Sequence, residues 1–177
     1  MKVVVLAGNS GSGKTTLIEG LIPALRSRGL RVSVLKHAHH GLEVDPPGKD
    51  SWRHREAGAY EVLAVSPERL VLQRTFEQPG ERSVHDVLTA FHPGVDWVLV
   101  EGWRDSNLHK IEVWRASTAT AVRYPDDPFV AAIALPAEDR LPQDTLRPQL
   151  DLGDADAVAA WLVDNGERFD YNPEAYR

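Results

Sequence analysis

Hydrophobic residues along the chain fall into short apolar runs that alternate with helix-like spacings. The apolar run at 3–7 predicts a buried strand, and apolar residues three and four positions apart after Lys14 predict a helix. Gly29 is expected to end this helix, and residues 31–36 predict a second strand. A strand, a helix and a strand in this order form a right-handed crossover, so we expect the two strands to pair in parallel.

The remaining pattern predicts further strands and helices and one hairpin. The connection at 37–49 is long and polar, which is typical of a functional segment. Asp50 or Ser51 is expected to cap a short helix, and Ser83 to cap another that ends near Phe91. The other predicted elements are hairpin strands at 61–65 and 69–74, strands at 96–102, 109–115 and 129–135, and a last helix at 155–164. We therefore expect a three-layer α/β fold with a mostly parallel sheet and an antiparallel hairpin portion.

Length and composition narrow the class of protein. A chain of 177 residues is expected to form one domain, here 1–166, followed by a polar and aromatic tail at 167–177. The absence of cysteine excludes disulfides, thiolate metal sites and a cysteine nucleophile. The net charge of −6 argues against nucleic-acid binding. No apolar run approaches the roughly 20 residues that span a membrane. Because a strand begins at once, we expect no signal peptide and a cytoplasmic protein.

A glycine-rich stretch follows the first predicted strand and fits the phosphate-binding loop, G-x-x-x-x-G-K-[ST]. Its residues are Gly8, Asn9, Ser10, Gly11, Ser12, Gly13, Lys14 and Thr15, with Thr16 next in the chain. Glycines permit a backbone whose successive N–H groups surround an anion, and the following helix N-terminus favours the same anion. Lys14 is predicted to bind the β- and γ-phosphates of a nucleotide, and the Thr15 hydroxyl to coordinate Mg²⁺.

An acidic residue ends the predicted strand at 96–102. Glu101 follows four apolar residues, as in the second acidic motif of phosphate-loop NTPases. Ligands of open α/β sheets bind at the carboxyl ends of the strands, so Glu101 and the phosphate loop are expected to share one edge. Glu101 is predicted to hold Mg²⁺, directly or through water, or to orient the attacking water. That motif more often ends in Asp, and a solvated acid at a strand end is the alternative.

A cluster of histidines follows the second predicted strand. His37, His39 and His40 lie within four residues, and Asp45 follows. Imidazoles suit zinc or nickel, but an extended segment puts His37 and His39 on one face and His40 on the other. We favour surroundings of phosphate or magnesium for His37 and His39 over plain surface or a dedicated metal site. Asp45 is predicted as the carboxylate of a switch-like loop that reaches the Mg²⁺.

Basic residues surround the start of the helix expected near residue 50. Lys49, Arg53 and Arg55 fit a second anionic-ligand or partner surface, with a solvated, capped helix as the alternative. Arg104 and Lys110 are also basic and come after the strand that ends in Glu101, but alone they are weak indications.

Together these segments resemble the family of molybdopterin-guanine dinucleotide biosynthesis protein B, MobB. The resemblance runs from residue 1 to about residue 165. It rests on the phosphate loop with its helix, Lys36-His37-Ala38-His39-His40 with Asp45, Pro47-Gly48-Lys49-Asp50-Ser51, Ala57-Gly58-Ala59 and Leu99-Val100-Glu101-Gly102. The family usually has Thr and Phe where this chain has Ala38 and Trp103.

The resemblance implies a GTP-binding adapter with weak GTPase activity that forms a homodimer, with GTP and Mg²⁺ as cofactors. It implies partnership with the guanylyltransferase that attaches GMP to the pterin of the molybdenum cofactor, with molybdopterin species, or with apo-enzymes that receive the product. We expect Lys14, Glu101 and Asp45 to be catalytic, Thr15, Glu101 and Asp45 to hold the metal, and the nucleotide contacts to extend from the loop to His37, His39, Lys49 and Arg53. No Asn-Lys-x-Asp element is present to select guanine, so the base contacts are expected elsewhere, around 151–154.

Two other classes of protein share the phosphate loop. A small-molecule kinase would position the γ-phosphate for an acceptor near His39, Arg53 and Arg55. A metallochaperone GTPase would use the histidines to carry nickel or zinc, although the missing cysteine counts against it.

Overall fold

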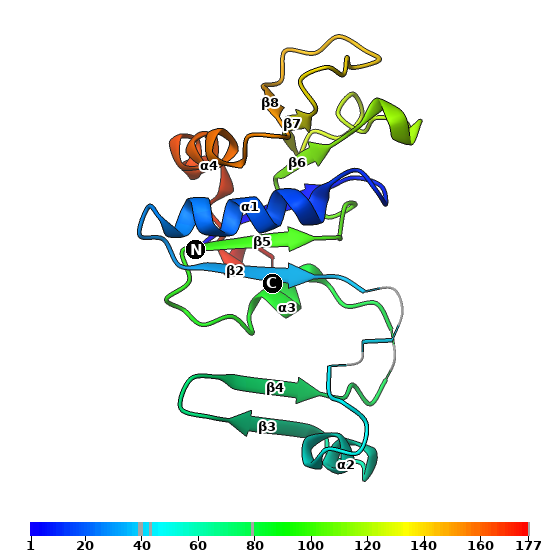
Figure 1. The fold of residues 1–177 in the computed structure, drawn as a ribbon, viewed down its shortest axis with the longest axis vertical. Helices are drawn as coiled ribbons and strands as arrows, with labels where there is room; N and C mark the ends of the chain where they lie inside the picture. The colour runs from blue at the N-terminus through cyan, green and yellow to red at the C-terminus, as the bar shows by residue number, and fades with distance from the viewer. Residues whose placement is uncertain (39–40, 43, 79, 177) are drawn as a thin grey trace. The chain divides into compact units, whose positions relative to one another are not determined.

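The computed structural model describes residues 1–38, 41–42, 44–78 and 80–176 (Figure 1). The chain forms two compact units, one of residues 1–37 and 83–177 and one of residues 38–82. The first unit carries a six-stranded sheet, and the second carries a two-stranded one. The second unit lies, in sequence, inside the range 1–166 that the sequence predicts as a single domain.

All six strands of the large sheet are parallel, in the order β2-β5-β1-β6-β7-β8. Their bounds are β1 Lys2–Ala7, β2 Val32–Lys36, β5 Trp97–Glu101, β6 Lys110–Val113, β7 Val130–Leu135 and β8 Gln149–Asp151. The predicted direct pairing of the first two strands is wrong, because β5 lies between them: Glu101 is in register with Leu6 on one side and Lys36 on the other. This order brings the carboxyl ends of β1, β2 and β5 to one edge.

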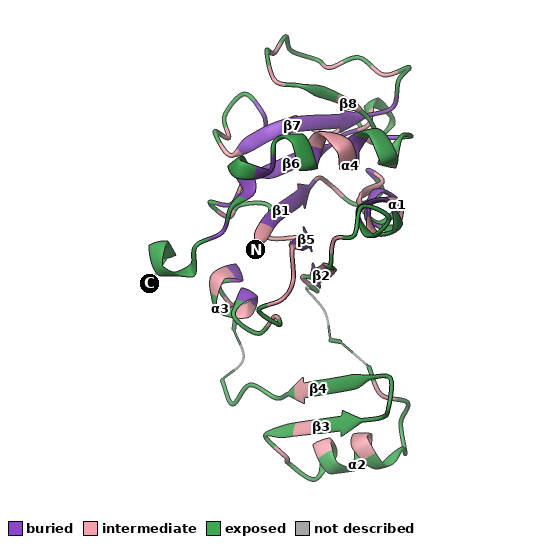
Figure 2. Cartoon of the chain, turned by 90° about the vertical axis from the view of Figure 1, so that its left-hand side faces the viewer, coloured by how far each residue is buried: buried purple, intermediate pink, exposed green. Residues whose placement is uncertain are grey.

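Helices cover both faces of this sheet, which gives the predicted three layers. The helices α1 (Lys14–Arg26) and α4 (Ala155–Asp164) pack with one face of the strands in the largest apolar core. The short helix α3 (Val84–Leu88) packs against the opposite face. Ser83 caps α3 by accepting a hydrogen bond from the His85 N–H, as predicted, but α3 ends before Phe91. Figure 2 shows that the central strands are buried between these layers, whereas the edge strands β2 and β8 are more exposed.

Two connections on the α3 side of the sheet contain no α-helix. The chain passes from β5 to β6 through 102–109 and from β6 to β7 through 114–129, and the structure describes all of these residues. The second connection holds a single 3₁₀ turn, η1, at Ala116–Thr118. Crossovers between parallel strands usually carry a helix that fills this layer, so here loops must cover the strand below.

The segment predicted as a C-terminal tail belongs to the first unit, and its described residues, 167–176, lie against the rest of that unit. They include the 3₁₀ turns η2 (Gly166–Phe169) and η3 (Pro173–Tyr176). Phe169 is buried in the core with α1 and α4, and the Tyr171 N–H donates to the Met1 carbonyl at 3.0 Å.

The second unit contains α2 (Asp50–Glu56) and the predicted antiparallel hairpin of β3 (Glu61–Val65) and β4 (Leu70–Arg74). The predicted capping of α2 by Asp50 or Ser51 is wrong, since the helix already includes both and Lys49 takes the cap position without a side-chain hydrogen bond. Most side chains of the hairpin are exposed (Figure 2).

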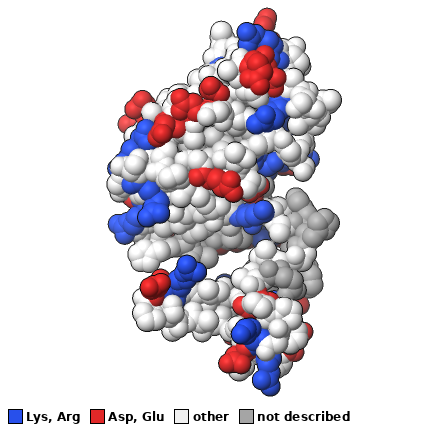
Figure 3. Space-filling view, in the orientation of Figure 1, with Lys and Arg blue, Asp and Glu red and all other residues white. Residues whose placement is uncertain are grey.

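Charge and hydropathy add two observations. On the face seen in Figure 3, acidic and basic side chains are interspersed within each unit. No helix in the described part of the chain is long and apolar enough to cross a membrane.

Candidate functional site

The glycine-rich loop joins β1 to α1, and two of its glycines adopt left-handed backbone angles. Gly11 has φ 78° and Gly13 has φ 102°, a region that side chains with a Cβ rarely enter. Gly13 is also the residue that precedes the first turn of α1. A Cβ on Gly8 would collide with the Val113 carbonyl oxygen and with Ser12 Oγ. The sequence therefore folds here into the tight loop that the glycine spacing predicts.

Lys14 reaches back across this loop. Its Nζ donates to the carbonyl oxygen of Asn9 at 2.8 Å. Burial lowers the pKa of Lys14 and the charge of Arg104 adds to the effect, while Glu101 opposes it. Lys14 is partly buried and forms no ion pair with a carboxylate of the described residues, which leaves the ammonium group suited to an anionic ligand at the loop.

Thr15 and Glu101 meet at the edge of the sheet. The Thr15 hydroxyl, in the first turn of α1, donates to Glu101 Oε1 at 3.0 Å. Lys36 Nζ lies 4.0 Å from Glu101 Oε2, and only 17% of the Glu101 side chain is exposed. The expected shared edge is thus present, with a hydroxyl and a carboxylate, both hard oxygen ligands, next to each other.

Two arginines near the loop were not predicted as nucleotide contacts. Arg115 Nε donates to the Ser12 carbonyl oxygen at 3.1 Å, and Arg104 Nη1 donates to Asn9 Oδ1 at 3.1 Å. The Ser12 hydroxyl is enclosed and has no hydrogen-bond partner within the described residues. Both arginines follow strands that end at this edge, and that position in the sequence is the signal by which they could have been found.

A backbone hydrogen bond holds His37 next to Glu101. Its N–H donates to the Glu101 carbonyl oxygen at 2.9 Å, and its ring stacks on Trp103 with the ring centroids 4.4 Å apart. A Cβ on Gly102, where φ is 108°, would lie 2.5 Å from the His37 Cβ, so this close approach requires glycine. The Trp103 indole thus fixes the orientation of the His37 ring.

The other predicted site residues are not assembled by the described structure. Thr16 is exposed on α1, and His39 and His40 lie outside the described residues. Asp45, Lys49 and Arg53 belong to the second compact unit, so their place at the nucleotide remains a prediction. One carboxylate oxygen of Asp45 is enclosed without a hydrogen-bond partner in the described part. Among the described residues, no three histidine or acidic side chains are grouped to hold a metal ion.

A family model described as MobB, molybdopterin guanine dinucleotide synthesis protein B, matches residues 3–136. The chain belongs to the MobB family. The match takes in the phosphate loop, Glu101, Arg104 and Arg115, so the MobB family assignment covers the edge of the sheet described above.

Two relatives of this MobB-family chain carry the name molybdopterin-guanine dinucleotide biosynthesis adapter protein. The Haemophilus influenzae protein is 41% identical over 162 residues, which cover 89% of this chain and 87% of that protein. The Escherichia coli protein is 31% identical over 163 residues, which cover 92% and 91%.

Solved structures share the fold. The crystal structure of a MobB protein homolog from Bacillus stearothermophilus aligns with a TM-score of 0.71 at 24% identity, covering 94% of this chain and 99% of that one. Bacillus subtilis MobB aligns with a TM-score of 0.68 at 23% identity, covering 97% and 100%. The predicted fold, of the phosphate-loop NTPase type with a mostly parallel sheet and an antiparallel hairpin, is confirmed.

Proposed function

We propose that this MobB-family protein is a GTP-binding adapter in molybdopterin guanine dinucleotide biosynthesis, with a slow GTPase activity. The names of its relatives support the adapter role. The observation that carries the nucleotide part is the contact of Thr15 with Glu101 at the mouth of a glycine-rich loop. A hydroxyl, a carboxylate and a lysine at the N-terminus of one helix form a site for a triphosphate and its metal.

The loop supplies the phosphate contacts. The backbone N–H groups that end at Gly13 and the start of α1 present a positive field to the phosphates. The Lys14 ammonium exchanges its contact with the Asn9 carbonyl for the β- and γ-phosphates. Arg104 and Arg115, which contact the loop at Asn9 and Ser12, add positive charge where a triphosphate concentrates negative charge.

Magnesium fits the oxygen pair at the edge of the sheet. Thr15 Oγ1 and the Glu101 carboxylate would hold it, and Asp45 remains the candidate third ligand. When bound, Mg²⁺ neutralises charge on the β- and γ-phosphate oxygens. Glu101, held by Thr15 and flanked by Lys36, is the group that orients a water for attack. We place the discrimination of guanine in the segment 151–154, because the Leu152 side chain would lie 3.3 Å from a Cβ on Gly13, beside the loop.

As partners we propose the guanylyltransferase that attaches GMP to the pterin, molybdopterin species, and a second copy of this chain. The hairpin supports the homodimer. Leu63, Val65, Leu70 and Leu72 lie on one face of it, because each faces its partner across the strands, and they are 60%, 77%, 63% and 47% exposed. An isolated two-stranded hairpin is at best marginally stable in water, so an apolar face of this kind gains stability when a second copy covers it.

Calorimetric titration tests the nucleotide assignment. Wild-type protein and the Lys14→Ala variant are titrated with GTP and with ATP, each with Mg²⁺. Removing the ammonium group is expected to weaken GTP binding by about 100-fold or more. Arg140→Ala serves as the matched control, because within the described residues this arginine donates hydrogen bonds to the nearby carbonyl oxygens of Ala137 and Asp139.

The two nucleotides separate the candidate functions. Tight GTP binding that Lys14→Ala abolishes, with weak ATP binding, supports the adapter. Preference for ATP would instead favour the small-molecule kinase, and unchanged GTP binding in Lys14→Ala would remove the loop as the site.

A further inference from the structure

Strand β6 carries two buried charges on the face that loops cover. Lys110 and Glu112 are only 1% and 3% exposed. Successive side chains of a strand point to opposite faces, and Ile111 and Val113 pack into the core with α1 and α4. Lys110 and Glu112 therefore point to the opposite side, where the connections 102–109 and 114–129 replace helices.

Both buried charges hold these connections in place. Lys110 Nζ donates to the carbonyl oxygens of Arg104 and Ser106 at 3.1 and 2.8 Å, and to Asp127 Oδ2 at 2.9 Å. The Glu112 carboxylate accepts the N–H groups of Arg123 and Tyr124 at 2.7 and 2.8 Å. Lys110 and Glu112 thus use their hydrogen bonds to hold the backbone of the connections 102–109 and 114–129 in place.

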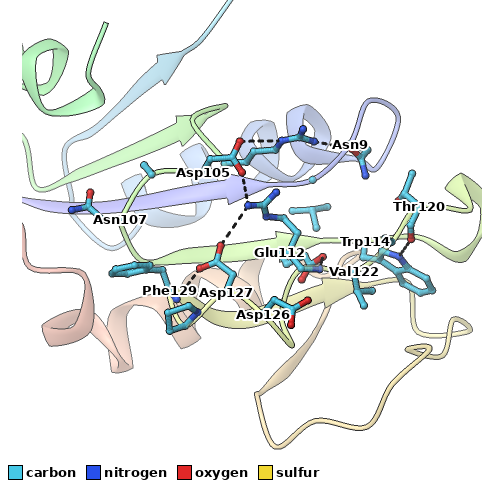
Figure 4. Close-up of a pocket in the computed structure, with 17 residues that line it drawn as sticks. Asn9, Asp105, Asn107, Glu112, Trp114, Thr120, Val122, Asp126, Asp127 and Phe129 are labelled. Carbon is cyan, nitrogen blue, oxygen red and sulfur yellow. Dashed lines mark hydrogen bonds and ion pairs between the residues drawn. The ribbon is translucent and has the colours of Figure 1, made fainter. Parts of the chain in front are cut away.

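Between the two connections lies a cavity of about 760 Å³. Its wall includes Gly8 and Asn9, the first residues of the phosphate loop, and β6 contributes Glu112 (Figure 4). The volume is in the range of pockets that bind small molecules and cofactors. The cavity lies wholly within the first compact unit and next to the proposed nucleotide site.

A chain of alternating charges runs from the phosphate loop along this cavity (Figure 4). Arg104 Nη1 donates to Asn9 Oδ1 at 3.1 Å, and Arg104 Nε lies 3.6 Å from Asp105 Oδ2. Asp105 binds Arg123 at 2.5 Å, and Arg123 lies 3.8 Å from Asp127. Arg104 is the first member of this series of charges, and 52% of its side chain is exposed. It can therefore turn towards a ligand without breaking the ion pairs among Asp105, Arg123 and Asp127.

Some polar groups of the cavity have unused hydrogen-bonding capacity. The Ser106 hydroxyl and Arg123 Nε are enclosed and have no hydrogen-bond partner in the described part of the chain. Asp126 lines the cavity, and its carboxylate is exposed and makes no hydrogen bond or ion pair with the described residues. Unsatisfied enclosed polar groups in a native protein often mark a place where a ligand or water binds.

The balance of charge limits the class of ligand. The wall presents Arg104 and Arg123 together with four carboxylates, those of Asp105, Glu112, Asp126 and Asp127. A simple anion would meet more negative than positive charge here. A ligand that offers N–H donors to a carboxylate and an anionic group to an arginine satisfies both kinds of side chain.

The 2-amino-4-oxopyrimidine ring has this donor chemistry. Its ring N–H and amino group are adjacent donors that a carboxylate accepts as a pair. Pterins and guanine both contain this ring, and a phosphate on its substituent would supply the anion. The size of the cavity and its place beside the phosphate loop suit such a ligand next to a bound nucleotide.

We propose that this cavity binds a pterin phosphate, with Asp126 accepting from the pyrimidine edge and Arg104 binding the phosphate. The choice of a pterin over a guanine nucleotide rests on the proposed function in molybdopterin chemistry. Arg104 then contacts both the phosphate loop, through Asn9, and the second ligand. The two ligands would therefore be held next to each other on one face of the loop.

Fluorescence titration with neopterin phosphate tests this site, because the pterin ring is itself fluorescent. The wild-type protein is titrated without nucleotide, beside Asp126→Asn and Arg104→Met. Each substitution removes one charged hydrogen-bonding group and is expected to weaken binding by about 10-fold or more. Asp164→Asn on α4 and Arg140→Ala are the matched controls, since both side chains lie away from the cavity lining.

Additional titrations distinguish the proposed pterin cavity from the proposed GTP site. Lys14→Ala is expected to keep its affinity for neopterin phosphate while it loses GTP, and inorganic phosphate alone is expected not to compete. If neither Asp126→Asn nor Arg104→Met changes the affinity for neopterin phosphate, the cavity assignment is overturned. Displacement of bound neopterin phosphate by an equal concentration of GMP would reassign the cavity to guanine. If GTP binds through Lys14 but neopterin phosphate does not bind, the cavity proposal alone fails.

Discussion

Thr15 Oγ1 donates to Glu101 Oε1 at 3.0 Å, although the two residues are 86 positions apart in the chain. The contact exists because β5 pairs with β1, which places Glu101 in register with Leu6 just before the glycine-rich loop. A threonine in the first turn of α1 then lies within reach of the carboxylate. This pair of oxygens is the part of the site on which the role of Glu101 depends.

Replacing Glu101 by Gln separates binding from hydrolysis. The amide keeps the size of the side chain and an acceptor for Thr15 but removes the negative charge that would serve the metal and the attacking water. We expect GTP affinity to change by less than about 10-fold and single-turnover hydrolysis to fall by about 100-fold. Glu19→Gln, on an exposed position of α1, is the control. Equal hydrolysis rates in wild type and Glu101→Gln would remove Glu101 from the reaction.

Gly13→Ala tests the shape of the loop. Alanine at φ 102° is strained, and its Cβ would lie 3.3 Å from Arg115 Nη2 and from Leu152 Cδ2. Gly29, with φ 79° and open space around it, is a matched position outside the site. Both substitutions to Ala are expected to cost about 1–2 kcal/mol of unfolding free energy. Only Gly13→Ala is expected to abolish GTP binding, as measured by calorimetry; retained binding there would mean that the loop tolerates a side chain.

The local parts of the fold were predicted well from the sequence. The last helix has the predicted bounds, because Asp154 caps it and Asn165-Gly166 follow it. The hairpin was predicted because Ser66-Pro67-Glu68 separates two apolar runs. Strand β8 was missed, since its three residues, Gln149–Asp151, carry no readable alternation and form a strand only by pairing with β7. The neighbours of a strand depend on the whole sheet, which is why β5 was not expected between β1 and β2.

The site was predictable where a motif fixes the backbone. The loop and Glu101 share an edge because glycine spacing and strand direction are both local properties of the sequence. The cavity was missed because Glu112 was interpreted only as part of a strand and Lys110 only as one more basic residue near the predicted ligand edge. Their signal is two charges at alternate positions of a strand whose other residues are apolar, a pattern that places both charges on one buried face.

Glu112 predicts a pH dependence of stability. Burial raises the pKa of its carboxyl above the ordinary value of 4.5, although two backbone N–H groups and Arg123 oppose the shift. The folded protein therefore retains this proton to a higher pH than the unfolded chain, and stability falls as the pH rises from about 4.5 through the raised pKa. The glutamine of Glu112→Gln does not ionise in this pH range, so the free energy of unfolding of this variant lacks the pH dependence that Glu112 causes.

Urea denaturation of wild type and Glu112→Gln at a series of pH values measures the effect. The variant is expected to start about 1–3 kcal/mol less stable at low pH, because the amide cannot accept both N–H groups. The deficit should shrink as the pH rises, by about 1.4 kcal/mol for each unit by which the pKa is raised. A deficit that stays constant across this range would show that Glu112 has an ordinary pKa in the folded protein.

The hairpin predicts how the chain associates. Leu63 and Leu72 face each other across β3 and β4 within the exposed apolar face. The lysine charge of Leu63→Lys would have to be buried against a second copy, so light scattering coupled to gel filtration is expected to find a dimer for the wild type and a monomer for the variant. Leu146→Lys, at a fully exposed leucine of the first unit, should leave the dimer intact. Because both leucines are exposed in the single chain, neither substitution should cost more than about 0.5 kcal/mol of monomer stability. A dimer that survives Leu63→Lys would place the interface on another surface.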